Sequence, residues 1–485
     1  MTHDNPHHAR RWAILVVLAI AQLMVVLDAT IVNVALPSAQ KALHFSNADR
    51  QWIVTAYSLA FGSMLLLGGK ISDLFGRKWT FIAGLSGFAI ASAIGGAAGS
   101  FIVLAGARAL QGLFGALLAP AALSLLTTTF TDPAERGRAF GIYGAIAGGG
   151  ASLGLVLGGA LTQLIDWRAV MFVNLVFAVV AVAGALVLLV NQAPADKPKL
   201  DLPGILSVSG GLFALVYGVS HAQTTSWGNP LTIAMLAAAV VLLGLFVWIE
   251  RRAEHPLLPL RVLADRNRGA SLLSIGLASM AMFGVFLFLT YYLQQNLGYS
   301  PILTGVAFLP MTLVLVATST IATTRLAPRV GPRPLITIGM ALGAAALLYL
   351  TRIGIHSSFA TAILPALLVM GVGLGLIFAV AMSNATLGVE PQDAGVASAT
   401  VNASQQVGGA IGTALLSTLA VTATTSYLAG AHTTAALAAH ATVHGYTTAF
   451  AWSAAIFLLG AIAAALLFPR GVPQTARAAE PGFAH

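Results

Sequence analysis

Long apolar segments separated by short polar ones make up most of the chain. A helix needs about 20 apolar residues to cross the roughly 30 Å hydrocarbon core of a bilayer, and fourteen segments approach that length. We therefore predict an all-α integral membrane protein with fourteen transmembrane helices. The predicted spans cover residues 12–34, 51–69, 79–98, 101–127, 138–163, 168–190, 203–220, 231–249, 269–293, 302–324, 334–351, 359–382, 402–422 and 447–468.

The composition agrees with a lipid environment. The chain is 58% hydrophobic and only 8% charged, whereas soluble proteins carry about 25% charged residues. Its net charge of +9 comes from short basic clusters between the spans, so we expect no nucleic-acid binding. The absence of cysteine excludes disulfides, thiolate metal sites and cysteine nucleophiles. The first apolar run lacks a clear small-residue cleavage site, and we interpret it as a retained helix.

The distribution of lysine and arginine predicts the orientation in the membrane. If the N-terminus is cytoplasmic, nineteen basic residues of the connecting segments fall on the cytoplasmic side and four on the outer side. Cytoplasmic loops of membrane proteins carry such an excess. We therefore expect residues 1–11 and 469–485 to be cytoplasmic tails of a multi-pass protein of the cytoplasmic (inner) membrane.

An internal repeat predicts how the spans are grouped. The sequence GGKISDLFGRKW follows the second span, and the related sequence RLAPRVGPRPL follows the tenth at an offset of 255. The same offset carries the start of the first span to that of the ninth. We predict an N-terminal six-helix bundle (12–190), a linker with two additional helices (191–268) and a C-terminal six-helix bundle (269–468). Related halves of this kind are a recurring transporter design, with the substrate near the midplane.

Five motifs in a fixed order identify a possible family. They are LDATIVNVALP in the first span, GGKISDLFGRK after the second, RALQGLFGALLAPAAL in the fourth, YYLQQNLGYSPILTGVAFLP after the ninth and ASATVNASQQVGGAIGTAL in the thirteenth. Together they resemble the major facilitator superfamily, and within it the fourteen-helix drug:proton antiporters (EmrB/QacA-like). The resemblance covers nearly the whole chain. It implies two pseudo-symmetric six-helix bundles that export bulky hydrophobic drugs or antibiotics by alternating access, as a monomer. The energy source would be the proton gradient, with no cofactor.

The fifth span departs from the antiporter pattern. The resemblance predicts Gly-Pro followed by Gly-Gly, but the chain reads GLVLGG, with Leu155 in place of proline. No proline kink is therefore expected there. Glycines that allow another helix to approach closely recur in this span at Gly150, Gly154, Gly158 and Gly159.

Asp28 and Arg108 are the two ionisable residues well inside the predicted spans. A charged side chain at a helix centre costs about 2.5–3.5 kcal/mol, so both require an explanation. Asp28 lies about six residues, roughly 9 Å, before the outer end of its span, and Arg108 lies at a similar depth. We predict a direct or water-bridged pair. It could be a structural ion pair, or Asp28 could exchange a proton while substrate competes for the same site, with Gln111 in the same network.

The loop between the second and third spans is predicted to be a conformational latch. Asp73 could accept hydrogen bonds from the N-terminal amides of a helix or pair with Arg77. The alternative is an ordinary polar loop. In the second half Pro328 aligns with Asp73, so any latch there should be weaker. The predicted latch residues are Gly69, Asp73, Gly76, Arg77 and Lys78.

Aromatic and amide side chains are the candidates for a substrate cavity, although each could instead pack against other helices or lipid. With one buried carboxylate, partly offset by Arg108, the substrate should be neutral or carry one positive charge. The candidate cavity residues are Asn33, Tyr57, Gln111, Phe283, Phe286, Tyr291, Tyr292, Gln294, Gln295, Asn402 and Gln405.

Other classes of function find little support. A membrane enzyme would need a nucleophile–base pair or a metal cluster, and the spans offer neither, so we predict no catalytic residues. His432, His440 and His444 include an i, i+4 pair without a nearby carboxylate, so no metal site is predicted. The sequence contains no GxxxxGK[ST] loop, so we do not expect ATP to be the energy source. The six-helix repeat and the latch loop argue against a channel. A transporter of the same fold for a lipid or a metabolite remains the alternative.

Overall fold

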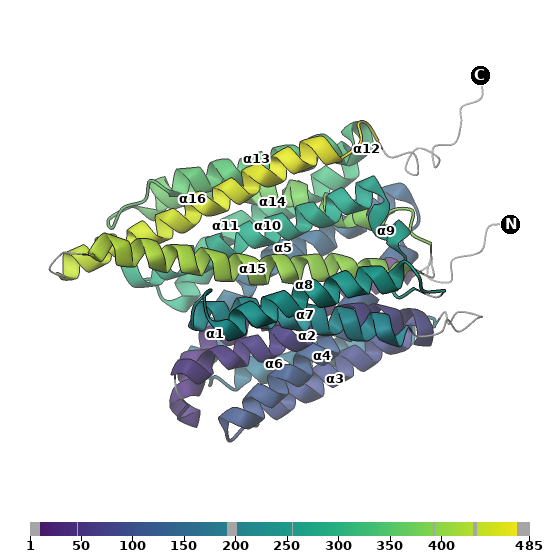
Figure 1. Cartoon of the computed structure of the whole chain (residues 1–485), viewed down its shortest axis with the longest axis horizontal. Helices are drawn as coiled ribbons and strands as arrows, with labels where there is room; N and C mark the ends of the chain where they lie inside the picture. Colours follow the sequence, from purple (N-terminus) through teal and green to yellow (C-terminus); the bar gives the residue numbers. More distant parts are fainter. Residues whose placement is uncertain are drawn as a thin grey trace.

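The computed structural model describes residues 10–45, 47–191, 201–254, 256–390, 393–429 and 434–472. Long α-helices dominate these residues, and short π-helical turns (η) extend three of them (Figure 1). In chain order the elements are α1 Arg11–Leu43, α2 Asn47–Phe75, α3 Arg77–Gly96, α4 Phe101–Thr129, α5 Pro133–Leu164, α6 Ala169–Leu188, α7 Leu202–Thr224, α8 Pro230–Glu250, α9 Leu260–Ala264, α10 Arg266–Tyr291, η2 Tyr292–Asn296, α11 Pro301–Ile321, η3 Ala322–Leu326, α12 Ala327–Val330, α13 Pro332–Leu350, η4 Phe359–Ile363, α14 Leu364–Ala385, α15 Ala394–Leu428 and α16 Ala435–Leu467.

The number of membrane helices agrees with the sequence pattern. In the described residues thirteen helices are long and apolar enough to cross a bilayer, and α5 makes a fourteenth if its two segments count as one span. Those segments, 133–147 and 152–164, meet at 47°. The bend lies at the glycine run that precedes Leu155, so α5 bends without the proline of the antiporter pattern. The predicted all-α fold is confirmed.

Several helices are longer than their predicted spans. α1 continues to Leu43 rather than ending near residue 34, α15 begins at Ala394 rather than near 402, and α16 begins at Ala435 rather than near 447. An apolar run marks only the part of a helix that lies in hydrocarbon, whereas caps and turns set its ends. Thr434, for example, accepts a hydrogen bond from the backbone N–H of Leu437 and so starts α16.

Polar residues between the apolar segments start other helices in the same way. Asp132, Asn229 and Ser300 each accept hydrogen bonds from backbone N–H groups in the first turn of α5, α8 and α11, and a proline follows each of them. Such a cap satisfies donors that have no partner within the helix, and proline at the first position sacrifices no hydrogen bond. These short signals fix where one span ends and the next begins.

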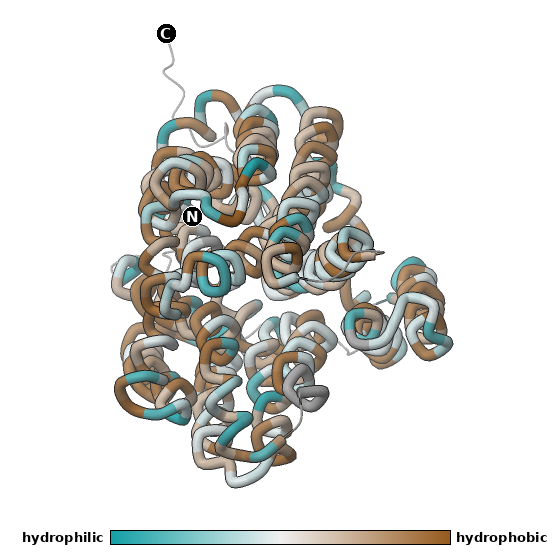
Figure 2. Tube along the Cα trace, turned by 90° about the vertical axis from the view of Figure 1, so that its left-hand side faces the viewer, coloured by the Kyte–Doolittle hydropathy of each residue, from teal (hydrophilic) through white to brown (hydrophobic). Residues whose placement is uncertain are grey.

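The helices form two bundles with a helix pair beside them. α1–α6 make the first bundle, and α10–α16 make the second (Figure 1). The bundles meet mainly where α5 packs on α11 and α14, and where α2 packs on α15. α7 packs on both α2 and α15 and carries α8 on its other side, so the pair stands outside the two bundles (Figure 2).

The first and last helices share one end of the molecule. α1 begins there with Arg11, which pairs with Glu135 of α5 at 2.6 Å. Beyond the end of α16, a Cβ added at Gly331 would meet the carbonyl oxygen of Gly471. We call this the basal end, and the opposite end, where α1 ends and α16 begins, the distal end. Arg77, Arg136 and Arg268, which the sequence assigns to the cytoplasmic side, lie at helix ends of the basal end.

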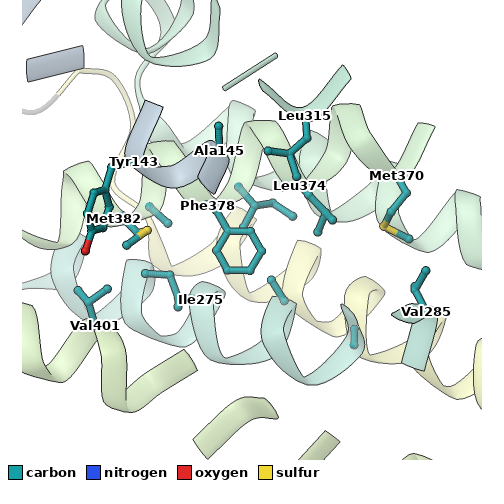
Figure 3. Packing of buried hydrophobic residues seen from close by; sticks show 14 of the residues in the cluster. Tyr143, Ala145, Ile275, Val285, Leu315, Met370, Leu374, Phe378, Met382 and Val401 are labelled. Atoms are coloured by element: carbon teal, nitrogen blue, oxygen red, sulfur yellow. The ribbon is translucent and has the colours of Figure 1, made fainter. Parts of the chain in front are cut away.

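Apart from hydroxyl and amide groups such as those of Ser271 and Asn384, the interior of the second bundle is apolar. Phe378 and Met382 of α14 pack with Ile275 of α10, Leu315 of α11 and Val401 of α15, and all five are buried (Figure 3). Interiors of this kind are close-packed and resist deformation. The second bundle therefore forms a stiff wall on one side of the interface between the halves.

Candidate functional site

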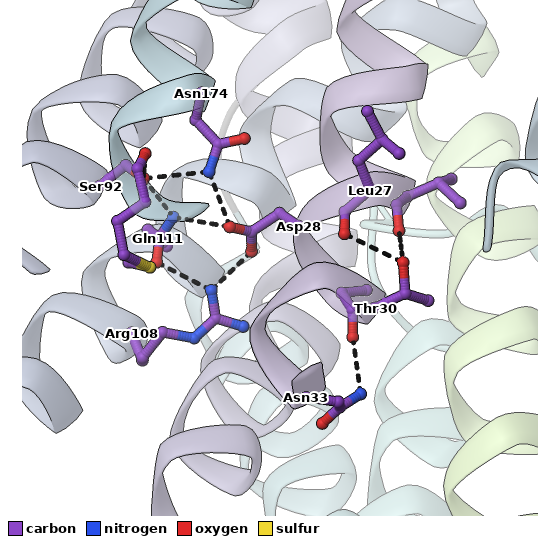
Figure 4. A network of polar contacts seen from close by, with 11 residues as sticks. Leu27, Asp28, Thr30, Asn33, Ser92, Arg108, Gln111 and Asn174 are labelled. Atoms are coloured by element: carbon purple, nitrogen blue, oxygen red, sulfur yellow. Dashed lines mark hydrogen bonds and ion pairs between the residues drawn. The ribbon is translucent and has the colours of Figure 1, made fainter. Parts of the chain in front are cut away.

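Asp28 lies near the middle of α1 and has no exposed surface. Its Oδ2 accepts a hydrogen bond from Arg108 Nη1 at 2.5 Å, and its Oδ1 accepts from Gln111 Nε2 at 3.1 Å and from Asn174 Nδ2 at 2.8 Å (Figure 4). The ion pair is therefore direct, with no need for a bridging water. The expected position six residues from the helix end is wrong, because α1 continues to Leu43.

Ser92 and Asn174 complete the network around Asp28, and sequence reasoning missed both. Ser92 Oγ of α3 accepts from Gln111 at 3.1 Å and from Asn174 at 3.0 Å, and it donates to the carbonyl oxygen of Met171 at 2.7 Å. Asn174 is the one polar side chain of α6. A single amide in so apolar a helix is the same kind of signal that singled out Asp28.

Arg108 is almost fully buried, with 2% of its surface exposed. Its Nη1 donates to Gln111 Oε1 at 2.8 Å as well as to Asp28. Its guanidinium carbon lies 4.4 Å from the centroid of the Tyr57 ring, at cation–π distance. Arg108 is thus held by a carboxylate, an amide and an aromatic face.

A cavity of about 190 Å³ lies between the two bundles, at the level of the middle of α1. Its walls carry no charged side chain and combine apolar groups with amides, hydroxyls and aromatic rings. Asp28 is absent from the lining, although its neighbours Ala29 and Thr30 belong to it. The lining residues are Gln22, Val25, Val26, Ala29, Thr30, Tyr57, Phe61, Ala119, Ala147, Ser279, Met282, Phe283, Phe286, Asn402, Gln405 and Gln406.

The separation of cavity and ion pair corrects one expectation. We expected substrate and proton to compete at one site, but Asp28 and Arg108 lie behind the cavity wall, among α3, α4 and α6. α1 presents Ala29 and Thr30 to the cavity and Asp28 away from it, because successive helix positions point in directions about 100° apart. Direct competition does not fit this conformation.

Five of the predicted cavity residues line the cavity, and six do not. Tyr57, Phe283, Phe286, Asn402 and Gln405 belong to the lining, whereas Gln111 belongs to the Asp28 network. The residues that lie elsewhere are Asn33, Gln111, Tyr291, Tyr292, Gln294 and Gln295.

Depth along the helix explains most of these errors. The YYLQQN segment lies at the distal end of α10, beyond the last cavity residue of that helix, Phe286. There the Tyr292 hydroxyl donates to the carbonyl oxygen of Gly354 at 2.6 Å, and the Tyr446 hydroxyl donates to Gln295 Oε1 at 3.0 Å. Asn33 is exposed and donates to the carbonyl oxygen of Ala29 in its own helix.

Sequence reasoning also missed polar cavity residues. Gln22 lies one and a half turns before Asp28 in the same apolar run, and its Oε1 accepts a hydrogen bond from the hydroxyl of Tyr143 at 2.8 Å. Gln406 lies beside Gln405 and also reaches the lining. An amide within the first span was a visible signal for Gln22, whereas helix rotation alone decides which of two adjacent glutamines faces a cavity.

The glycines of α5 pack against the helix that carries Asp28. A Cβ added at Gly150 would lie 2.7 Å from Val26 Cγ1, one at Gly158 would lie 2.8 Å from Ile31 Cγ1, and one at Gly154 would collide with the Thr30 hydroxyl. Gly159 faces α11 instead, where its Cβ would lie 2.9 Å from Ile302 Cγ1. The glycine series therefore brings α5 into close contact with α1.

Asp73 connects the two bundles at the basal end. Its Oδ1 accepts a hydrogen bond from the Gly395 backbone N–H at 3.0 Å, and its Oδ2 accepts from that of Val396 at 3.3 Å. Both amides belong to the first turn of α15, where the helix dipole favours a negative charge. Arg77 Nη2 lies 3.9 Å from Asp73 Oδ1. A Cβ at Gly69 would lie 2.7 Å from that of Ala399, so α2 and α15 touch there.

The predicted loop is shorter than expected, because Gly69 and Asp73 lie in the last turns of α2 and Arg77 and Lys78 begin α3, which leaves Gly76 as the connection. Gly76 and Lys78 contact the first bundle. Gly76 has φ +90°, a conformation that glycine adopts readily, and it forms the turn between α2 and α3. Lys78 Nζ donates to the carbonyl oxygen of Leu186 in α6 at 3.1 Å. The loop thus divides its contacts between the two bundles.

A second contact of opposite charge also joins the bundles at the basal end. Arg136 of α5, 8% exposed, donates to the carbonyl oxygen of Ser383 at 3.1 Å and to the Thr386 hydroxyl at 2.8 Å. These acceptors lie at the C-terminus of α14, where the helix dipole favours a positive charge. The basal end is therefore held by an anion at the start of one helix and a cation at the end of another.

Two of the three histidines near the last outer loop fall within the described residues. His440 and His444 lie in α16, and His432 lies outside the described residues. Across the part of the chain that the structure describes, no three His, Cys, Asp or Glu side chains gather closely enough to hold a metal ion.

Comparisons with known proteins agree with the geometry. The family model described as Major Facilitator Superfamily matches residues 18–413. The chain is 49% identical over 460 residues to the puromycin resistance protein of Streptomyces alboniger, covering 94% of this chain and 91% of that protein. It is 36% identical to the tetracenomycin C resistance and export protein of Streptomyces glaucescens, covering 86% of this chain and 79% of that protein.

A solved structure shares the fold. The crystal structure of the human organic anion transporter TETRAN aligns with a TM-score of 0.62 and 16% identity, covering 94% of this chain and 99% of that one. Together with the family match over most of the chain, the two-bundle architecture leads to one conclusion. The chain belongs to the major facilitator superfamily and is a transporter rather than an enzyme.

Proposed function

We propose that the protein is a proton-coupled antiporter that exports bulky hydrophobic compounds from the cytoplasm, acting as a monomer in the cytoplasmic membrane. The observation that carries this proposal is the Asp28–Arg108 pair, fully buried behind the wall of a cavity between the two bundles. A buried ion pair that serves structure alone could be replaced, both partners together, by apolar packing at little cost. A proton carrier needs the carboxylate.

The cavity lining supports the substrate class. Amides and hydroxyls offer hydrogen bonds, and Tyr57, Phe61, Phe283 and Phe286 offer aromatic surface without any fixed charge. Such a site accommodates varied apolar shapes with few polar requirements. A dication would need a second buried anion, so we expect neutral or singly charged substrates. Relatives named for puromycin and tetracenomycin resistance favour antibiotics, and puromycin is the first compound to test.

The basal contacts support a cycle of alternating access. Asp73 and Arg136 tie the bundles together at the basal end, so both contacts must break before the cavity opens on that side. The excess of basic residues there supports our assignment of this end to the cytoplasmic side. Asp28 has no exposed surface in this conformation, so it would exchange its proton with water in another conformation of the cycle.

Transport in proteoliposomes with an imposed pH gradient tests the proposal. The wild-type protein should accumulate puromycin against its concentration gradient, and Asp28→Asn should abolish this accumulation while still exchanging labelled for unlabelled puromycin. Asparagine keeps the shape of the side chain but cannot carry the proton. Asp166→Asn is the matched control, because that carboxylate is exposed and, in the described residues, its Oδ1 contacts Arg168: it accepts from the backbone N–H at 2.8 Å and lies 4.0 Å from Nη1. Undiminished uphill transport by Asp28→Asn would reject Asp28 as the proton carrier.

A further inference from the structure

Tyr57 of α2 lies between the substrate cavity and the buried ion pair. It lines the cavity and is only 4% exposed, and its ring centroid lies 4.4 Å from the guanidinium carbon of Arg108. Asp28 and Arg108 themselves do not line the cavity. A compound in the cavity therefore touches this ring rather than either member of the ion pair.

The backbones that carry the ring and the guanidinium are packed directly together. A Cβ added at Gly112, one turn after Arg108 in α4, would collide with the carbonyl oxygen of Tyr57 and would lie 2.9 Å from the backbone nitrogen of Phe61. α2 and α4 can hardly slide past each other at this point, because backbone meets backbone. With the two backbones fixed against each other, the Tyr57 ring is the part of the cavity wall that contacts Arg108.

Phe61 provides a natural comparison within the same wall. It lines the cavity one turn after Tyr57 and stacks on it, with ring centroids 5.5 Å apart and planes inclined by 13°. The cation–π contact of Arg108 in the described residues is with Tyr57. The two rings thus share the cavity but differ in their contact with the ion pair.

Few charged or titratable side chains surround Asp28. Of the helices packed against α1, α4 contributes the Arg108 guanidinium and α2 contributes Tyr57. From α3 and α6 come the neutral Ser92 and Asn174, and α5 presents glycines to this part of α1. Arg108 is therefore the main influence on the charge of Asp28, and Tyr57 contacts Arg108.

We infer that Tyr57 is a positioning residue that couples occupancy of the cavity to protonation of Asp28. A substrate packed against the ring presses it onto Arg108 and holds the guanidinium against Asp28, which favours the charged carboxylate. The O–H bond of protonated Asp28 then breaks, its electron pair stays on the carboxylate, and the proton passes to water in the conformation of the cycle that exposes the carboxylate. When the cavity empties, the ring relaxes and the protonated form is favoured. This inference rests on the proposed proton-coupled function.

Proton release on substrate binding tests the inference. Puromycin is added at saturating concentration to the purified protein in detergent and weak buffer, and the released protons are measured with a pH dye. Puromycin affinity is also measured across pH, since binding of substrate and proton must influence each other reciprocally. The wild-type protein should release protons. The ratio of puromycin affinities at high and low pH should be about tenfold smaller in Tyr57→Leu than in the wild type, the effect expected when a buried cation–π contact is lost. Tyr57→Phe, which keeps the ring, should behave like the wild type.

Phe61→Leu is the matched control, because it removes a ring from the same wall. It should weaken puromycin binding but leave proton release per bound puromycin unchanged. The inference is wrong if Tyr57→Leu binds puromycin weakly yet releases as many protons per bound puromycin as the wild type. It is also wrong if Phe61→Leu loses as much proton release as Tyr57→Leu. In both cases the proposed function stands. Wild-type protein that binds puromycin without releasing protons at any pH would reject both. Tyr57→Met offers a second ring-free variant that fills the space flexibly should Tyr57→Leu fail to fold.

Discussion

The two bundles have the same kind of backbone but different interiors. In the first bundle Asp28, Arg108, Gln111, Ser92 and Asn174 form a connected polar network (Figure 4). In the second bundle the interior is filled by apolar side chains of α10, α11, α14 and α15, and α14 contains no charged residue (Figure 3). The two halves therefore have different properties despite their repeat.

The difference continues at the cavity and in the loops. At the repeat offset of 255, Asp28 corresponds to Phe283, which contributes an aromatic ring to the cavity. Asp73, which bonds to the start of α15, corresponds to Pro328, which has no carboxylate to offer. A buried polar network is favourable only when each member finds partners, whereas an apolar interior mainly requires good packing. The comparison suggests that charge changes during transport belong to the first bundle and that the second bundle supplies a rigid wall.

Removal of Arg108 should reveal the largest difference between the two interiors. Arg108→Leu leaves the Asp28 carboxylate buried without its cation, and we expect it to lower the free energy of unfolding by about 3–5 kcal/mol. Phe378→Leu in the second bundle, at a side chain that is fully buried, should cost only about 1–2 kcal/mol, because it removes apolar volume and leaves no charge behind. Thermal unfolding in detergent provides the measurement.

A double variant distinguishes a charge effect from a packing effect. Asp28→Asn combined with Arg108→Leu removes both charges, so it should recover part of the stability that Arg108→Leu loses. Two results would contradict this prediction: Arg108→Leu is as stable as Phe378→Leu, or the double variant recovers no stability. Either result would show that the loss of a charge in the polar interior costs no more than the loss of apolar volume in the other bundle.

Much of the fold followed from the sequence, because lipid imposes strong rules. Each span must be apolar and about 20 residues long, so the number of helices was predictable. Likewise, a carboxylate in an apolar run requires a partner, so the contact between Asp28 and Arg108 was predictable from the sequence. The lengths of the helices were less predictable, because α1, α15 and α16 extend beyond their apolar runs.

The errors arose where rotation and depth of a helix decide the outcome. Asp28 was expected at the cavity, but α1 presents Ala29 and Thr30 to it instead. The YYLQQN segment has cavity-like composition but lies distal to the cavity. Asn174 escaped notice because an amide costs less to bury than a charge, so it was not recognised as a signal. Packing with other helices sets these angles and depths, and one sequence does not reveal them.

Replacing one buried amide in each bundle should give a smaller difference that sharpens the comparison. Asn174 donates to the Asp28 carboxylate, whereas Asn384 of α14 donates to the Ser271 hydroxyl at 2.9 Å. Hydrogen bonds to charged groups contribute about 1.5–3 kcal/mol, and neutral ones about 1 kcal/mol. We expect Asn174→Leu to lower stability by about 2 kcal/mol and Asn384→Leu by about 1 kcal/mol, measured by thermal unfolding.

The pH dependence of transport should separate the same two variants more clearly. Asn174→Leu removes a hydrogen-bond donor to the Asp28 carboxylate, so the pH profile of proton-driven puromycin transport should differ from that of the wild type. The native Asn384 amide donates to the carbonyl oxygen of Asn267 and to the hydroxyl of Ser271, and neither group titrates. The pH profile of Asn384→Leu should therefore match that of the wild type. Equal profiles for Asn174→Leu and the wild type would remove Asn174 from the proton site.

At the basal end, where the halves differ by one carboxylate, the effect on stability should be no larger than that of Asn174→Leu. Asp73→Ala removes an anion from the first turn of α15, an interaction that contributes about 0.3–1 kcal/mol, and up to about 2 kcal/mol when partly buried. Because Asp73 lies at the basal end, away from the cavity lining, its loss should lower the maximal rate of puromycin transport several-fold and leave KM nearly unchanged. Pro328→Ala, at the aligned position, should alter neither, since it removes no charge. Kinetics in proteoliposomes measure both parameters. If Asp73→Ala raises KM strongly at an unchanged maximal rate, the residue acts on substrate binding, and the contact between α2 and α15 is not a step in the cycle.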